Sequence, residues 1–117
     1  MDDLYFFRSD NGRVKIGRSV NVKARLNAVR CSSPVGVMLW AVLEGHGWEE
    51  CAWHAVFRDH RINGEWFKWN AAISRAVRLA QNRKEWWRPN IAADDTEGDV
   101  TFRRMLEYMR SADAQAA

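Results

Sequence analysis

The stretch that decides the fold is residues 49–67, EECAWHAVFRDHRINGEWF. Glu50 and His54 are four residues apart, so a helix would place them on one face, about one turn from each other. Trp53 and Phe57 would fall on a neighbouring, apolar face. The spacing therefore predicts a helix that turns one face to a core and offers the other for chemistry.

The second half of the stretch predicts a tight return of the chain. We expect the helix to begin at about Trp48 and to end near His60. Residues 63–64, Asn-Gly, then favour a turn that brings back Glu65, and the aromatic residues 66–67 anchor the return in apolar contacts. Two acids, a histidine and two arginines can thereby share one small space.

The N-terminal residues predict a β-hairpin. Residues 4–7 and 14–17 have the composition of strands and are separated by turn residues. A three-residue loop at residues 10–12 would put Tyr5 and Lys15 on the same face of the hairpin, whereas a two-residue turn would put them on opposite faces. We expect the longer loop, because a shared site requires one face.

A helix and a third strand follow the hairpin. Ser19 or Asn21 can cap the helix, in which apolar residues recur at helical spacing to about Arg30. Residues 32–34, Ser-Ser-Pro, end it. The β-branched and apolar run of residues 35–43 predicts a third strand, buried and central in the sheet.

The C-terminal part predicts another helix and then a change of character. Asn70 can cap a helix that completes a domain over residues 1–83. Residues 84–99 are expected to form a linker, because they contain Pro, Gly and an acidic cluster. Residues 100–112 predict a C-terminal amphipathic helix that packs on the domain or forms a homodimer, and residues 113–117 a frayed tail. The fold class is α+β, with a three-stranded, mostly antiparallel sheet made of the N-terminal hairpin and a central strand, flanked by helices, and with the extra C-terminal helix.

Length and charge limit the classes of function. A chain of 117 residues with 47% hydrophobic residues can form one domain with a real core, and its net charge is +3. Basic side chains crowd the first thirty residues, against only three aspartates there. These basic residues are Arg8, Arg13, Lys15, Arg18, Lys23, Arg25 and Arg30. This part of the chain is a candidate phosphate-facing surface, with Arg8, Arg13, Lys23 and Arg30 as nucleic-acid contacts.

The cellular compartment is inferred from the cysteines, the N-terminus and the lengths of the apolar runs. Cys31 and Cys51 form no CxxC pattern, and the acidic N-terminus does not resemble a signal segment. No apolar run approaches the roughly 20 residues needed to cross a bilayer. We therefore expect a soluble, cytoplasmic protein with no membrane partner.

Five short motifs occur in order along residues 4–69. They are LYFF at 4–7, KIG at 15–17, RL at 25–26, ExxWHxxF at 50–57 and GEWF at 64–67. In this order and spacing they resemble the GIY-YIG endonuclease superfamily, and within it the small phage-type branch with a Lys-Ile-Gly second motif and a Gly-Glu-Trp-Phe closing motif.

The resemblance implies hydrolysis of phosphodiester bonds in DNA, in preference to RNA, with one divalent ion, Mg²⁺ or Mn²⁺. It assigns the metal to Glu50, since a hard cation takes carboxylate oxygen and keeps several waters. Tyr5 matches the tyrosine that positions or deprotonates the attacking water. Arg25 matches the helix arginine that neutralises charge on the phosphate, and Arg18 could do the same from the hairpin.

The main departure from the family pattern is Lys15, which stands where the second motif has tyrosine. As a general base Lys15 would have to lose its proton near neutral pH, but as a phosphate contact it needs nothing special, and we favour that role. His54 or Tyr5 could then be the base. Glu65 either supports the site or forms a structural ion pair with an arginine at residue 58 or 61.

Purely structural roles for these residues, and other functions for the chain, stay open. Glu50 could merely favour a helix dipole, Tyr5 could be ordinary core, and Arg25 a solvated helix arginine. The alternative to a nuclease is a catalytically weak or inactive nucleic-acid-binding module with the same fold. A third hypothesis is a phage or host-defence interaction protein that uses its tryptophans as a binding surface.

Overall fold

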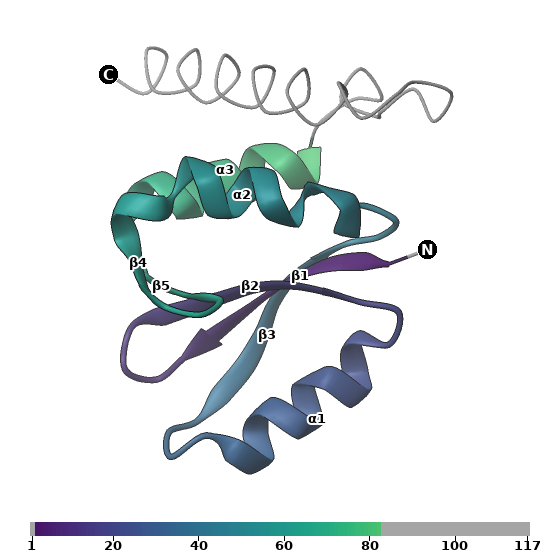
Figure 1. Ribbon diagram of the computed structural model, residues 1–117, viewed down its shortest axis with the longest axis vertical. Coiled ribbons are helices and arrows are strands. Elements are labelled where there is room, and N and C mark those ends of the chain that lie inside the picture. The colour runs from purple at the N-terminus through teal and green to yellow at the C-terminus, as the bar shows by residue number, and fades with distance from the viewer. Residues whose placement is uncertain (1, 83–117) are drawn as a thin grey trace. The chain divides into compact units, whose positions relative to one another are not determined.

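Figure 1 shows the computed structural model, which describes residues 2–82. The chain divides into two compact units, one ending at Asn70 and the other beginning at Ala71. The first unit contains a five-stranded antiparallel sheet with the strand order β3-β1-β2-β5-β4. The strands are β1 (Asp3–Ser9), β2 (Arg13–Ser19), β3 (Val37–Leu43), β4 (Arg61–Asn63) and β5 (Trp66–Lys68). The class is α+β, as predicted, but the sheet is larger than the three strands expected.

The β1–β2 hairpin has the predicted three-residue loop at residues 10–12. Gly12 has a φ of +79°, a left-handed conformation that favours glycine and that closes such loops. In the resulting register Tyr5 lies opposite Gly17, and Lys15 is two residues before Gly17 on the same strand. Tyr5 and Lys15 therefore lie on the same face of the sheet, as predicted.

Helix α1 (Val22–Ser32) begins where the sequence indicated. The Asn21 side-chain oxygen accepts a hydrogen bond of 3.0 Å from the backbone N–H of Ala24, so Asn21 is the N-terminal cap. Ser33 caps the other end. Figure 1 shows α1 on one face of the sheet and helix α2 (Glu50–Val56) on the other.

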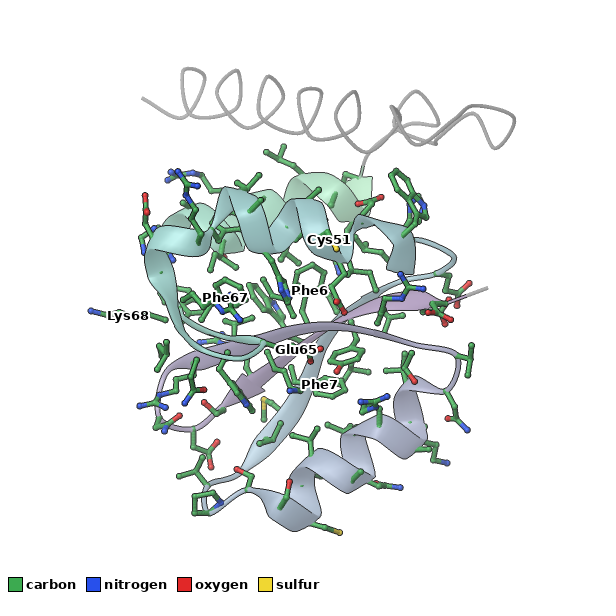
Figure 2. The ribbon with its side chains drawn as sticks, viewed as in Figure 1. Phe6, Phe7, Cys51, Glu65, Phe67 and Lys68 are labelled. Atoms are coloured by element: carbon green, nitrogen blue, oxygen red, sulfur yellow. The ribbon has the colours of Figure 1, made fainter. Side chains whose placement is uncertain are left out.

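Strand β1 is buried on both faces. Tyr5 and Phe7 face α1, where their rings stack with centroids 4.1 Å apart. Phe6 points to the opposite face and meets the Trp53 ring edge-on, with centroids 4.9 Å apart. Figure 2 shows Phe6 and Phe7 on opposite sides of the strands. The four apolar residues 4–7 are thus all core, because helices cover both sides of this strand.

The prediction that the third strand is central was wrong. β3 lies at the edge of the sheet and pairs with β1 alone. Met38 and Leu39 are 56% and 46% exposed. An apolar run can indicate burial on both faces, but it does not reveal whether a second strand pairs alongside. β4 and β5 were missed because each has three residues, too few to show an alternating pattern.

The helix expected from about Trp48 to His60 is shorter than predicted. The chain first makes a 3₁₀ turn, η1 (Gly47–Glu49), then α2, and then a second 3₁₀ turn, η2 (Arg58–His60). Phe57 leaves the helical region with φ −104° and ψ 17°, and the N–H of His60 donates to its carbonyl at 2.9 Å. The regular helix therefore ends before Phe57, whose side chain is buried, and the periodicity alone did not indicate this end.

The described part of the second unit is helix α3 (Ala71–Asn82), which begins directly after Asn70 as expected. Its buried residues share one face and are Ile73, Ala76, Val77 and Ala80. No helix within residues 2–82 is long and apolar enough to cross a membrane. The predicted domain limit at residue 83 stays a prediction. The predicted linker at 84–99, helix at 100–112 and tail at 113–117 lie outside the described residues.

Candidate functional site

The site lies where strand β2 continues past its neighbour. β5 pairs with β2 only at residues 13–15, and the N–H of Ile16 then donates to the Glu65 carbonyl at 3.0 Å. No strand in the described part of the chain pairs with this edge of residues 17–19. Side chains from both faces of the sheet can therefore reach the same backbone edge.

His54 occupies the place that a longer β5 would take. Its Nε2 lies 2.7 Å from the carbonyl oxygen of Ile16. Because a carbonyl only accepts, Nε2 carries the proton, and in the neutral ring Nδ1 holds the lone pair. The ring also packs on Phe67, with centroids 5.1 Å apart. His54 thus completes the hydrogen bonding of β2 from the α2 side.

Glu65 joins the two residues that the hairpin places on one face. Its Oε2 accepts a hydrogen bond of 3.3 Å from the Tyr5 hydroxyl and lies 3.1 Å from the Lys15 Nζ. The Lys15 ammonium also lies 5.4 Å from the centroid of the Trp66 ring, a cation–π contact. Glu65 follows Gly64 in the turn between β4 and β5, and Figure 2 shows it close to the sheet. The arginine partners considered from sequence are not what this carboxylate binds in the described structure.

Gly17 is required by this arrangement. A Cβ atom added at Gly17 would lie 2.3 Å from the Tyr5 hydroxyl oxygen and 2.8 Å from Glu65 Oε2. Both distances are shorter than any real contact of a methyl group. The glycine of the Lys-Ile-Gly motif therefore leaves the space in which the tyrosine and the carboxylate meet.

Glu50, the first residue of α2, faces the same edge. Burial raises the pKa of its carboxyl, and the negative charge of Glu65 raises it further. The charges of His54 and Arg18, and a hydrogen bond with the Arg18 backbone, oppose that rise. In a strand the N–H groups of Ile16 and Arg18 point to the same edge, so Glu50 and His54 approach one stretch of β2. The two acids are therefore close enough to repel each other.

The neighbouring acid, Glu49, has a different task. Its side chain is fully buried, 2.7 Å from His46 Nδ1, and it accepts a hydrogen bond of 3.1 Å from the Trp53 indole. Glu49 thus holds the N-terminus of α2 in the core, while Glu50 is left for the site. Sequence reasoning missed this division, although a tryptophan four residues after Glu49 was a signal for it.

Tyr5 stays a phenol in this environment. Burial raises the pKa of its hydroxyl, the charge of Glu65 and the hydrogen bond to it raise the pKa further, and Glu50 adds to the effect. The positive charge of Arg25 acts in the opposite direction. Tyr5 is therefore a hydrogen-bond donor to Glu65 at neutral pH, and its oxygen can still accept another hydrogen bond.

The two arginines expected near the phosphate are at the surface. Arg18 is half exposed, and its Nε binds the Asp2 carboxylate at 2.6 Å. Arg25 is exposed on α1 and acts on Tyr5 through its charge. Both remain within electrostatic range of the site.

The four predicted nucleic-acid contacts do not form one surface. Arg8 lies on the opposite face of the sheet from Lys15, with its guanidinium 5.5 Å and 5.0 Å from the rings of Trp40 and Trp69. The Arg30 Nε donates to the Val37 carbonyl at 2.8 Å and so ties α1 to β3. The other two, Arg13 and Lys23, are exposed. The structure therefore gathers Tyr5, Lys15, Glu50, His54 and Glu65, and it leaves Arg8 apart.

A metal ion at this site would have only a small donor set. No group of three or more His, Cys, Asp or Glu side chains within residues 2–82 is arranged to hold a metal ion. Two carboxylates, Glu50 and Glu65, nevertheless repel each other at a half-buried edge. A cation such as Mg²⁺, which keeps most of its waters and takes one or two carboxylates, fits that set.

A sequence model of the T5orf172 domain matches residues 4–88, which is most of the chain. The chain belongs to the T5orf172 domain family. The match includes every site residue described above. T5orf172 domains are phage-associated and often linked to HNH or GIY-YIG-like nucleases, so membership suggests a phage-type domain with a nucleic-acid-related role. Among curated proteins and solved structures, none matches this T5orf172 chain.

Proposed function

We propose that this T5orf172 domain is a metal-dependent endonuclease of the GIY-YIG type that hydrolyses phosphodiester bonds in DNA. One observation carries the proposal. The Glu65 carboxylate binds both the Tyr5 hydroxyl and the Lys15 ammonium, and its charge acts on Glu50 from the other face of the sheet. Acid, phenol, ammonium and imidazole thus meet at one backbone edge, as a phosphodiesterase needs.

Glu50 would hold the divalent ion, Mg²⁺ or Mn²⁺. Its raised pKa reflects a negative charge that is poorly solvated and close to Glu65, and a bound cation would relieve both effects. The ion would supply Lewis-acid stabilisation of the oxygen that leaves phosphorus. Because Glu50 is the first residue of α2 and only half-buried, its carboxylate is reachable from solvent.

Tyr5 would move the proton of the attacking water. Its hydroxyl donates to Glu65, so its oxygen keeps a lone pair that can accept a hydrogen bond. Tyr5 is fully buried in the free protein, so the attacking water would have to enter beside the partly exposed Glu65 carboxylate. As the water oxygen bonds to phosphorus, the water proton passes to the Tyr5 oxygen and the Tyr5 proton passes to Glu65. The P–O bond to the leaving oxygen breaks, and that oxygen takes a proton from solvent. Glu65 is thus the final base, and Tyr5 does not need to be a phenolate beforehand.

Lys15 would bind phosphate instead of acting as the base. Its ammonium makes an ion pair with Glu65 and a cation–π contact with Trp66, both of which require the charged form. Arg18 and Arg25 would add positive charge around the phosphate from the hairpin and from α1. His54 would hold the backbone of β2 in position beside the site, because its Nε2–H donates to the Ile16 carbonyl.

The proposal is tested by incubating the full chain with single- and double-stranded DNA and either Mg²⁺ or Mn²⁺. Nicks or fragments are expected with the native chain and not with Glu50→Ala or after chelation. Products that persist both in Glu50→Ala and in the presence of chelator would overturn the mechanism.

A second candidate function is a nucleic-acid-binding module without turnover. It is favoured by Lys15, which stands where the family motif has tyrosine and is committed to an ion pair with Glu65. Binding to DNA that weakens with salt, without cleavage under either metal, would select this module. Absence of both binding and cleavage would instead select a protein-interaction role.

A further inference from the structure

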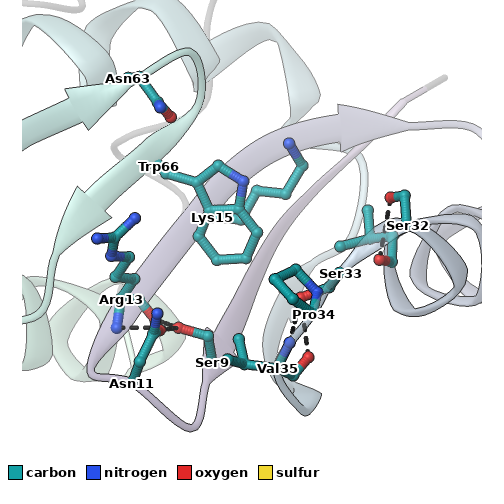
Figure 3. A pocket seen from close by; sticks show the side chains of 11 residues that line it. Ser9, Asn11, Arg13, Lys15, Ser32, Ser33, Pro34, Val35, Asn63 and Trp66 are labelled. Atoms are coloured by element: carbon teal, nitrogen blue, oxygen red, sulfur yellow. Dashed lines mark hydrogen bonds between the residues drawn. The ribbon is translucent and has the colours of Figure 1, made fainter.

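A separate cavity opens beside the site, at the hairpin end of the sheet. Its volume is about 300 Å³, at the small end of the range of ligand pockets. It lies between the β1–β2 loop, the C-terminal end of α1 and the β4–β5 turn, and Figure 3 shows the side chains that line it. Lys15 and Trp66, which contact each other next to Glu65, form part of its wall. The cavity and the proposed active site therefore share Lys15.

The lining combines three kinds of chemistry. Arg13 and Lys15 supply positive charge, and none of the cavity's lining residues within the described chain is acidic. Asn11 and Asn63 supply side-chain amides, which can both donate and accept hydrogen bonds. Trp66, with valine and proline side chains opposite, supplies apolar surface. In nucleotide sites, cations bind the phosphate, amides bind the edge of the base, and a flat apolar side chain stacks on the face of the base. The cavity has all three.

We infer that this cavity binds one unpaired nucleotide of the DNA strand, next to the phosphate at the proposed active site. The inference rests on the proposed function only for the adjacent scissile phosphate. A base stacked in a duplex could not enter a cavity of this kind, so the nucleotide must be unpaired or turned out of the helix. The preferred substrate class is therefore DNA with a single-stranded or unpaired segment at the cleavage point.

The ends of the cavity differ in charge, which orients the nucleotide. Residues 32–35 comprise the last residue of α1, its C-terminal cap Ser33 and the two loop residues that follow. A helix C-terminus carries a partial negative charge, which repels phosphate and attracts amino groups. Arg13 and Lys15 are on the β2 side. The phosphate therefore belongs beside β2 and the base beside α1. The Asn11 amide is already fixed, because its oxygen accepts a hydrogen bond from the Ser9 hydroxyl and its NH₂ is left to donate.

The test uses the full chain, labelled with ¹⁵N and titrated with deoxyadenosine 5′-monophosphate in NMR experiments. Saturable shifts are expected at Asn11, Arg13 and Asn63 and at the Trp66 indole. Asn63→Ala should weaken binding about five-fold and Arg13→Ala about tenfold, as expected for one neutral and one charged hydrogen bond. Lys68→Ala is the matched control, since Lys68 lies directly opposite Arg13 on β5 but does not line the cavity. It should change the affinity less than about two-fold.

Separate arms with inorganic phosphate and with deoxyadenosine identify what is recognised. Each should bind more weakly than the nucleotide. Equal affinity for inorganic phosphate, an absence of saturable shifts at the cavity, or a Lys68→Ala effect as large as that of Arg13→Ala would overturn the inference. Nucleotide binding without any DNA cleavage would reject the proposed function and leave the cavity assignment intact. DNA cleavage without nucleotide binding would reject the cavity assignment and leave the proposed function intact.

Discussion

Tyr5 donates a hydrogen bond of 3.3 Å to Glu65, which is 60 residues away in the chain. The bond links the first strand to the turn before the last strand of the sheet, and it passes over Gly17, where no side chain stands in the way. It also places the buried Tyr5 hydroxyl, whose pKa is raised, next to the Glu65 carboxylate, which can take its proton. This pair is the proposed route for the proton of the attacking water.

Tyr5→Phe should lower the cleavage rate by at least about 100-fold, the usual contribution of a positioned proton-transfer group. The ring stays, so the free energy of unfolding should fall by only about 1 kcal/mol for the lost hydrogen bond. Single-turnover cleavage and urea denaturation measure the two effects.

Glu65→Gln should lower the cleavage rate by a similar factor, because an amide can accept the Tyr5 hydrogen bond but cannot take its proton. A fully active Glu65→Gln would eliminate this route.

The adjacent acids Glu49 and Glu50 should respond oppositely to the same change. Glu49→Gln should cost about 2 kcal/mol of stability, because it disturbs a buried, hydrogen-bonded carboxylate. Glu50→Gln should abolish metal-dependent cleavage and, without metal, stabilise the fold at neutral pH by no more than about 1 kcal/mol, since its carboxyl is partly screened by solvent. Thermal denaturation and cleavage assays on both variants check this contrast. Loss of stability in Glu50→Gln would contradict it.

The pH dependence of Glu50 has a definite sign. Its pKa is raised in the folded state, so the folded protein binds this proton more tightly than the unfolded chain does. The contribution of Glu50 to stability is thus fully present below its ordinary pKa of about 4.3 and is lost as the pH rises through the raised value. The gain in stability of Glu50→Gln over the native chain should therefore vanish in acid and reach its full size near neutral pH.

The metal should stabilise only the ionised form of Glu50. At a hundred times its dissociation constant, Mg²⁺ should add about 2.7 kcal/mol to the free energy of unfolding of the native chain. The effect should shrink as the pH falls through the raised pKa of Glu50, and it should be absent in Glu50→Gln. Melting curves recorded with Mg²⁺ and with chelator, across pH, measure it. An equal Mg²⁺ effect in Glu50→Gln would place the metal elsewhere.

Gly17→Ala should disrupt the site, with a stability cost of about 1–3 kcal/mol from overpacking. Combining it with Tyr5→Phe should give little relief, because the ring carbon Cζ also lies 2.4 Å from the added methyl group. Gly12→Ala is the comparison: no atom lies within 4 Å of its added Cβ, and only its positive φ is strained. It should cost about 1 kcal/mol and leave cleavage nearly unchanged. Denaturation curves and cleavage rates for these three variants distinguish steric from backbone effects.

Lys15→Arg separates the two roles considered for this residue. Arginine keeps the charge but cannot lose its proton at any relevant pH. Cleavage within about tenfold of the native rate is expected for Lys15→Arg, with a larger loss for Lys15→Met, because phosphate binding needs charge. A Lys15→Arg variant as inactive as Lys15→Met would instead support Lys15 as the base.

Much of the fold could be predicted because its signals are local. The Asn21 cap, the end of α1 near residues 32–34 and the turn that follows Asn63 each depend on a few neighbouring residues. The hairpin register follows from the loop length, but the sequence left a two-residue and a three-residue loop open. The longer loop was expected only because a shared site required it, and the structure has it.

Only the tertiary structure decided which distant groups meet. The edge position of β3, the early end of α2 at Val56 and the burial of Glu49 instead of Glu50 depend on packing between segments far apart in the chain. The same is true of Glu65, whose role as the common partner of Tyr5 and Lys15 requires β5 to stop where β2 continues. Local patterns set the shape of each element, whereas a hydrogen bond between residues 60 positions apart exists only once the sheet has aligned them.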